Sequence, residues 1–187
     1  MMYRTALNQI QPDGRATWSP VVISGLLRGL VGAAVFCNLF LQMPMGIVPF
    51  IFGLTSGILG NLIFLGVGGL VFSVVTGTGP RAFHLYARSF IVALPLYLLA
   101  LPVVIVLMPV LPADASFATA EGARHVITEM RSTLAMEIYR YTQLTIFSAQ
   151  MIYLWSTFRQ QAPVNKIWAA VFICMGIYIL LFVTRII

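Results

Sequence analysis

The sequence predicts an all-α membrane protein, a polytopic helix bundle with about five transmembrane helices and one amphipathic interfacial helix. Of the 187 residues, 60% are hydrophobic and only 9% are charged, whereas soluble domains are about 25% charged. The stretch from Gly29 to Pro80 contains no Asp, Glu, Lys, Arg or His. One bilayer crossing needs about 20 apolar residues, so this stretch alone predicts two crossings and a turn.

The chain is predicted to hold a polar leader over 1–19 and a single transmembrane domain over 20–187. Ser19 followed by Pro20 is typical of a helix start, because serine caps free amide groups and proline fits the first turn. The first span is therefore predicted over 20–42.

The second span is predicted over 47–76, after a turn at Pro44–Gly46. Small residues in both spans recur every four positions, a spacing that lets two helices approach closely. The glycines predicted to pack in this way are Gly25, Gly29, Gly53, Gly57 and Gly60. Alternatively, the glycine-rich second span lines a permeation path, with Asn38 and Asn61 as its polar lining.

Arg28 lies about two turns inside the first span. Its long side chain either extends back to the membrane interface or faces a partner helix. Apart from Arg28 and Arg140, which lie near the ends of their spans, the predicted spans hold no charged residue. This absence argues against ion-coupled transport.

The third span is predicted over 89–111, after a loop that ends in a short helix start. In that loop Arg81, His84 and Arg88 recur at three- and four-residue steps, which places them on one helical face. A basic face beside the membrane suits lipid phosphates. We therefore expect these three residues to bind anionic phospholipid headgroups.

An amphipathic helix is predicted over 117–137, where apolar residues fall at three- and four-residue steps and charges are interleaved. The fourth span, over 138–158, is the most polar. Its Gln143 and Gln150 are seven residues apart and face the same way, which favours a role in helix packing. The fifth span is predicted over 167–184.

Charge sidedness predicts the orientation, because short loops rich in Lys and Arg stay inside. With five spans, one side holds Arg4, Arg15, Arg81, Arg88, Arg159 and Lys166, and the other holds Arg124, Arg131, Arg140 and Arg185. This distribution predicts an N-terminus inside and a C-terminus outside. The membrane is expected to be a bacterial inner membrane.

Few residues in the chain belong to the types and spacings that common catalytic or metal-binding sites need. No H-E-x-x-H, G-x-S-x-G or P-loop motif is present, and the predicted spans place His84 and His125 on opposite sides of the membrane. Met43 and Met45 are soft donors that suit Cu(I), but methionines at a membrane boundary usually pack as apolar residues. We expect no enzymatic activity, no metal site and no cofactor. The net charge of +6 favours anionic membrane headgroups over nucleic acid.

Two segments resemble bacterial members of the Yip-domain family, the five-span relatives of Rab-GTPase-interacting membrane proteins. They are GGLVFSVVTGTGPRAFHLYARSFIVALP at 68–95 and YLWSTFRQQAPVNKIWAA at 153–170. The resemblance implies a cytoplasmic N-terminus, five closely spaced helices and no enzymatic activity. The chain lacks the Asp-Leu-x-Gly-Pro signature of eukaryotic members, so the resemblance does not imply GTPase-linked trafficking.

Three functional hypotheses remain from the sequence. The first is a scaffold or accessory subunit of a membrane complex, bound to other membrane subunits or to itself. The second is a small-solute channel or transporter lined by the second and fourth spans. The third is anionic-lipid binding or membrane organisation.

Overall fold

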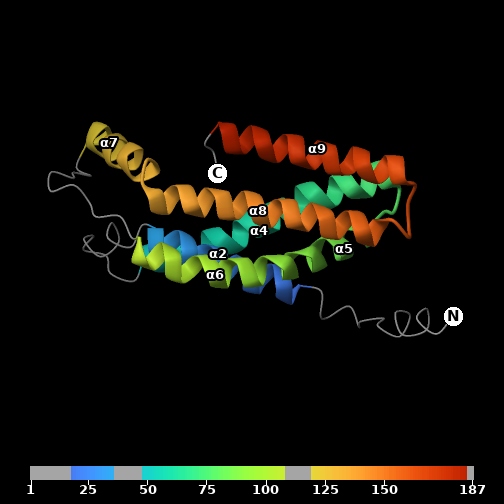
Figure 1. The fold of residues 1–187 in the computed structure, drawn as a ribbon, viewed down its shortest axis with the longest axis horizontal. Coiled ribbons are helices and arrows are strands. Elements are labelled where there is room, and N and C mark those ends of the chain that lie inside the picture. The colour runs from blue at the N-terminus through green and yellow to red at the C-terminus, as the bar shows by residue number, and fades with distance from the viewer. Residues whose placement is uncertain (1–17, 36–47, 108–118, 185–187) are drawn as a thin grey trace.

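The computed structural model describes residues 18–35, 48–107 and 119–184, and every regular element in these ranges is a helix. The five long helices run side by side along the long axis of the molecule (Figure 1). They are α2 (Ser19–Val35), α4 (Val48–Thr76), α6 (Ala93–Val106), α8 (Leu134–Phe158) and α9 (Val164–Val183). The predicted all-helical class is therefore confirmed for the described residues.

Three helical stretches are long and apolar enough to cross a membrane: Gly53–Thr76, Arg81–Val106 and Val164–Val183. These stretches indicate a membrane protein. α2 is apolar but shorter within its described bounds. α8 spans 25 residues but carries polar side chains, and Arg140, Gln143 and Gln150 among them are buried inside the bundle.

Several sequence predictions lie outside the described residues. They include most of the leader (1–17), the end of the first predicted span with Asn38 (36–42) and the turn that follows it. The end of the third predicted span (108–111) and the start of the amphipathic segment (117–118) also lie there.

The third apolar helix begins at Arg81, eight residues before the predicted start of the span at 89. α5 (Arg81–Ser89) continues through a short 3₁₀ turn, η1 (Phe90–Val92), into α6. The tighter turn has a local cause, since Pro95 has no N–H to bond to the carbonyl one turn before it. Gly77 and Gly79 make the sharp turn before α5 with φ of +74° and +59°, angles that L side chains rarely adopt.

α2 and α4 cross at three of the predicted packing glycines. A Cβ atom on Gly25 would lie 2.7 Å from the Ile58 Cα, and one on Gly29 would lie 2.7 Å from the Gly53 carbonyl oxygen. A Cβ on Gly57 would overlap the Gly25 carbonyl. Only glycine therefore permits this backbone separation, as in other small-residue membrane interfaces.

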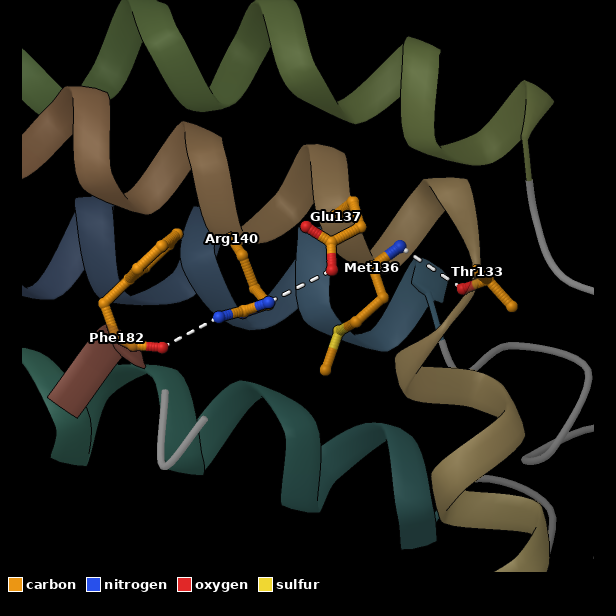
Figure 2. Close-up of polar contacts among 5 residues, drawn as sticks. All are labelled: Thr133, Met136, Glu137, Arg140 and Phe182. Atoms are coloured by element: carbon orange, nitrogen blue, oxygen red, sulfur yellow. Dashed lines mark hydrogen bonds and ion pairs between the residues drawn. The ribbon is translucent and has the colours of Figure 1, made fainter. Parts of the chain in front are cut away.

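The predicted amphipathic helix is interrupted at Ser132 and Thr133. α7 covers Ala120–Arg131, and α8 begins at Leu134, four residues before the predicted span. Thr133 is in an extended conformation, and its Oγ1 accepts a hydrogen bond of 3.4 Å from the Met136 amide (Figure 2). This is a helix N-cap, which starts a new helix and lets α7 diverge from the bundle (Figure 1).

The end of α9 is tied to the start of α8 by Arg140. Its guanidinium donates hydrogen bonds to the Glu137 carboxylate at 3.1 Å and to the Phe182 carbonyl oxygen at 2.8 Å (Figure 2). The same guanidinium lies 4.5 Å from the centroid of the Phe182 ring. A cation at this point compensates the free carbonyl groups at the C-terminal end of α9.

Aromatic side chains fill the bundle between α4, α5, α8 and α9. Phe147 and Tyr178 stack with ring centroids 4.1 Å apart, and Phe72 packs against Phe158 with centroids 4.9 Å apart. A second group of buried side chains, including Val31, Tyr97 and Ile146, joins α2, α6 and α8. Arg28 and Asn61 lie where these two apolar regions meet.

Candidate functional site

The guanidinium of Arg28 faces the interior of the bundle. Its Nη1 donates a hydrogen bond of 3.3 Å to the Asn61 Oδ1 on α4, and its Cζ lies 5.2 Å from the centroid of the Phe64 ring. Gly60 makes room for it, since a Cβ there would lie 3.0 Å from Nη1. Of the two sequence-based alternatives for Arg28, the structure shows the side chain facing a partner helix.

Asn61 connects Arg28 to the backbone of α2. The Asn61 Nδ2 donates hydrogen bonds to the Ser24 Oγ at 2.8 Å and to the Val21 carbonyl oxygen at 3.2 Å. Asn61 and Ser24 are buried, with 3% and 0% of their surface exposed. Because each hydrogen-bonding group of Asn61 is engaged, its amide is fixed with the oxygen toward Arg28.

A second group of polar side chains, on α6 and α8, lies near Arg28. The Tyr97 hydroxyl donates a hydrogen bond of 2.8 Å to the Gln143 Oε1. The Nε2 atoms of Gln143 and Gln150 are buried and have no hydrogen-bond partner among the described residues. Buried amide donors are nearly always bonded, so these two amides mark a place where an acceptor is missing.

No carboxylate in the described ranges forms an ion pair with Arg28. Glu137 pairs with Arg140, and Glu129 lies 3.8 Å from His125. The titratable side chains near Arg28 are Tyr139, Tyr97 and Tyr178, which are neutral groups. The positive charge of Arg28 is therefore not balanced by a described residue.

An apolar cavity of about 310 Å³ adjoins Arg28. Apart from Arg28 and two tyrosines, its walls are apolar side chains and glycines from α4, α8 and α9. Ile63 and Val67 on α4 and Ile177 on α9 line it and are also exposed on the outside of the bundle. The cavity therefore opens between α4 and α9 toward the lipid.

A much smaller cavity of about 20 Å³ lies on the other side of Arg28. Polar walls come from Arg28, Asn61, Tyr97, Gln143 and Gln150. This volume holds about one water molecule. Arg28, Phe64, Phe147 and Tyr178 line both cavities, so Arg28 stands at the junction of an apolar chamber and a small polar one.

The predicted headgroup residues lie elsewhere, on α5. Arg81 and His84 are exposed and Arg88 is half-buried. None of the three lines either cavity beside Arg28. Their role as a headgroup site stays a prediction.

Gln143 and Gln150, predicted as packing residues, both lie in the polar cavity with Arg28. Gln143 does join two helices, through Tyr97. A Cβ atom on Gly53 would lie 3.3 Å from the Ala33 Cβ, and Gly60 makes room for Arg28. The structure thus places the predicted glycines at the contact of α2 with α4, and both predicted glutamines in the polar cavity beside it.

Tyr97 and Tyr178 belong to the site but were not predicted from the sequence. The signal in the sequence was a tyrosine hydroxyl within an otherwise apolar span. This signal is not specific, because tyrosines are also common at membrane interfaces. Among the residues that the structure describes, no group of three His, Cys, Asp or Glu side chains could hold a metal ion. Cys174 is buried as a free thiol beside the apolar cavity.

No family model, curated protein or solved structure matches the chain. The resemblance to the Yip-domain family therefore stays a prediction from two segments. The candidate site is defined by its geometry alone.

Proposed function

We propose that this protein is a non-enzymatic membrane protein that binds an anionic amphiphile between its helices. The observation that carries the proposal is the position of Arg28 beside an apolar cavity with no described carboxylate paired to it. The proposal applies the lipid-binding hypothesis of the sequence to the interior of the bundle, and the headgroup site on α5 stays a separate prediction.

The chemistry at both ends of such a ligand, its anionic head and its hydrocarbon tail, supports this ligand class. An Arg at the centre of a membrane helix costs about 2.5–3.5 kcal/mol on insertion scales, and such residues usually mark a binding or transport site. An anion at Arg28 offsets this cost through a charge-assisted hydrogen bond in a medium of low dielectric constant. The adjoining apolar walls match a hydrocarbon tail, and the opening between α4 and α9 gives that tail access from the bilayer.

The proposed architecture has five spans, with α2 and α8 crossing the membrane beside the three apolar stretches. Support comes from packing, since α2 contacts α4 and α6 while α8 contacts α6 and α9. The buried polar residues of α8 face this interior and not the lipid. A helix can therefore cross with these residues because its neighbours solvate them.

The proposed orientation is N-terminus inside, in a bacterial inner membrane. The turns at one end of the bundle carry the exposed cations Arg81, Arg159 and Lys166. The acidic residues Glu121, Glu129 and Glu137 lie on α7 and the first turn of α8, at the other end (Figure 1). Under the positive-inside rule the basic end is the inner one.

Native mass spectrometry with lipid extraction tests the function. The full chain is purified in mild detergent as wild type, Arg28→Gln and Arg159→Gln. The last variant removes the same charge from the exposed α8–α9 turn. The wild type and Arg159→Gln are expected to retain an anionic amphiphile, and Arg28→Gln is expected to lose at least about tenfold in occupancy. Equal occupancy in all three proteins would contradict the proposal.

The scaffold and solute-transport hypotheses stay predictions. Native mass spectrometry also bears on them, because a scaffold retains protein subunits that the lipid-binding proposal does not require. A copurifying subunit with no anionic amphiphile would favour the scaffold.

A further inference from the structure

We infer that the anion is a single-chain carboxylate, a long-chain fatty acid whose carboxylate binds Arg28 and whose tail fills the apolar cavity. This inference rests on the proposed function and specifies its ligand. Four features of the two cavities support this ligand, and the first of them, the size of the polar cavity, favours a fatty acid over a phospholipid.

The first feature is the size of the polar cavity. At about 20 Å³ it holds about one water molecule. One oxygen of a planar carboxylate matches this volume while the other oxygen remains beside Arg28. A phosphodiester is tetrahedral and carries a glycerol and a second substituent, so it requires a larger polar space than these walls leave.

The second feature is the set of free hydrogen-bonding groups. Arg28 brings donors only, and the unpaired atoms of Gln143 and Gln150 are both Nε2 donors. The Gln143 oxygen is already engaged by Tyr97, and the Asn61 oxygen by Arg28. The site therefore offers donors and a positive charge to an anion that only accepts hydrogen bonds. An ionised carboxylate meets this requirement, and so does a phosphodiester, so the size of the polar cavity decides between them.

The third feature is the size of the apolar cavity. Its volume of about 310 Å³ is about twice that of an engineered cavity that binds benzene. It therefore holds about a dozen carbon atoms, which matches the buried part of one hydrocarbon chain.

The fourth feature is the opening between α4 and α9. Ile63, Val67 and Ile177 line the cavity and are exposed at the bundle surface. The end of a longer tail can therefore remain in the bilayer while the head group lies at Arg28. A single-chain acid can enter laterally by this route without crossing a polar surface.

Titration of the detergent-purified full chain, followed by native mass spectrometry, tests the inference. The ligands are palmitate, methyl palmitate and palmitoyl-oleoyl phosphatidylglycerol. The proteins are wild type, Arg28→Gln, Gln150→Leu and Gln160→Leu. Gln160 is exposed in the α8–α9 turn and serves as the control for the removal of one amide.

Palmitate is expected to bind the wild type and Gln160→Leu equally. Its affinity is expected to fall about tenfold or more in Arg28→Gln and about tenfold in Gln150→Leu, which loses one donor to a charged group. Methyl palmitate is expected to bind the wild type at least about tenfold more weakly than palmitate. Gln150→Leu retains Arg28, so it tests the site even if Arg28→Gln fails to fold.

Three results would overturn the inference in different ways. If phosphatidylglycerol binds more tightly than palmitate and depends on Arg28, the ligand is a phospholipid and the proposed function stands. If no ligand loses affinity in Arg28→Gln, both proposals fail. If Gln150→Leu binds palmitate as Gln160→Leu does, the carboxylate does not occupy the polar cavity.

Discussion

The Arg28 guanidinium and the Asn61 side-chain amide meet at 3.3 Å across the interface of α2 and α4, although 33 residues separate them in the chain. The interface that brings them together is built from glycines, so the two backbones lie close enough for a short amide to reach a guanidinium. This relationship organises the site, because it holds the Arg28 cation inside the bundle, where it lines two cavities.

Asn61→Ala is expected to lower the free energy of unfolding by about 1–2 kcal/mol. The change removes three hydrogen bonds of the Asn61 amide, including those to Ser24 and the Val21 carbonyl, and interhelical polar contacts in membranes contribute about 0.6–1.7 kcal/mol each. Equilibrium unfolding in mixed micelles measures it. Asn165→Ala, at an exposed position in the first turn of α9, is the control. Equal stability of the two variants would argue against the Asn61 network.

Gly57→Ala is expected to destabilise the bundle by about 1–3 kcal/mol, since the added Cβ overlaps the Gly25 carbonyl and must push α2 away from α4. Gly66→Ala is the matched control in the same helix. No atom lies within 4 Å of a Cβ at Gly66, so this change is expected to be neutral or to stabilise by about 0.5–1 kcal/mol. Thermal unfolding of both variants in detergent measures the difference. Similar melting temperatures would contradict the close crossing.

Arg140→Gln is expected to release the C-terminal end of α9. The variant loses the hydrogen bond to the Phe182 carbonyl and the ion pair to Glu137. Hydrogen exchange of the amides near Leu180–Thr184 is therefore expected to become at least about tenfold faster, since a hydrogen bond from a charged donor contributes about 1.5–3 kcal/mol. Arg159→Gln, which removes a charge far from this contact, should leave these amides unchanged. Unaltered exchange in Arg140→Gln would show that α9 is held by its apolar contacts alone.

Single-cysteine labelling tests the proposed crossing of α8 and the orientation. Ser132→Cys and Gln160→Cys are exposed positions just before and just after α8, introduced after replacement of Cys37 and Cys174 by alanine. A membrane-impermeant maleimide added to intact cells is expected to label position 132 and not position 160. Permeabilised cells should label both. Labelling of both positions in intact cells would mean that α8 does not cross, and the reversed pattern would mean that the orientation is opposite.

The exposed basic face of α5 gives a separate prediction for lipid headgroups. Arg81→Ala combined with Arg88→Ala is expected to reduce the number of phosphatidylglycerol molecules retained in native mass spectra, at about 1 kcal/mol per cation near an anionic surface. Arg124→Ala with Arg131→Ala, at exposed positions of α7, removes the same charge at the other end. Equal retention in the two double variants would remove the headgroup hypothesis for α5.

Much of the architecture follows from local features of the sequence. Long apolar runs predicted helices, because in lipid the backbone N–H and C=O groups of a segment must bond to one another, and an α-helix achieves this. The four-residue spacing of Gly25 and Gly29 predicted a close helix contact, which the structure places against α4. The start of α8 at Leu134 was missed. The amphipathic pattern continues without interruption up to the N-cap Thr133, so periodicity alone does not reveal the short break between the two helices.

The site itself depends on long-range pairing that no spacing encodes. Nothing near Asn61 in the sequence indicates that it meets Arg28, and the junction of Tyr97 with Gln143 joins residues 46 positions apart. The cavities depend on side-chain volumes at several helices together, including the positions of Arg28 and Tyr86 that Gly60 and Gly68 allow. Sequence reasoning therefore identified Arg28 as unusual but did not associate it with a cavity. The headgroup site that it predicted on α5 stays a prediction, since a basic face is visible in the local pattern there.

An experimental structure of the protein crystallised from a lipidic mesophase, without added ligand, tests the central claim most directly. We expect elongated density in the cavity between α4 and α9 that ends within hydrogen-bond distance of the Arg28 guanidinium. The account would be contradicted if a carboxylate of the chain itself were paired with Arg28 and the cavity were filled by side chains.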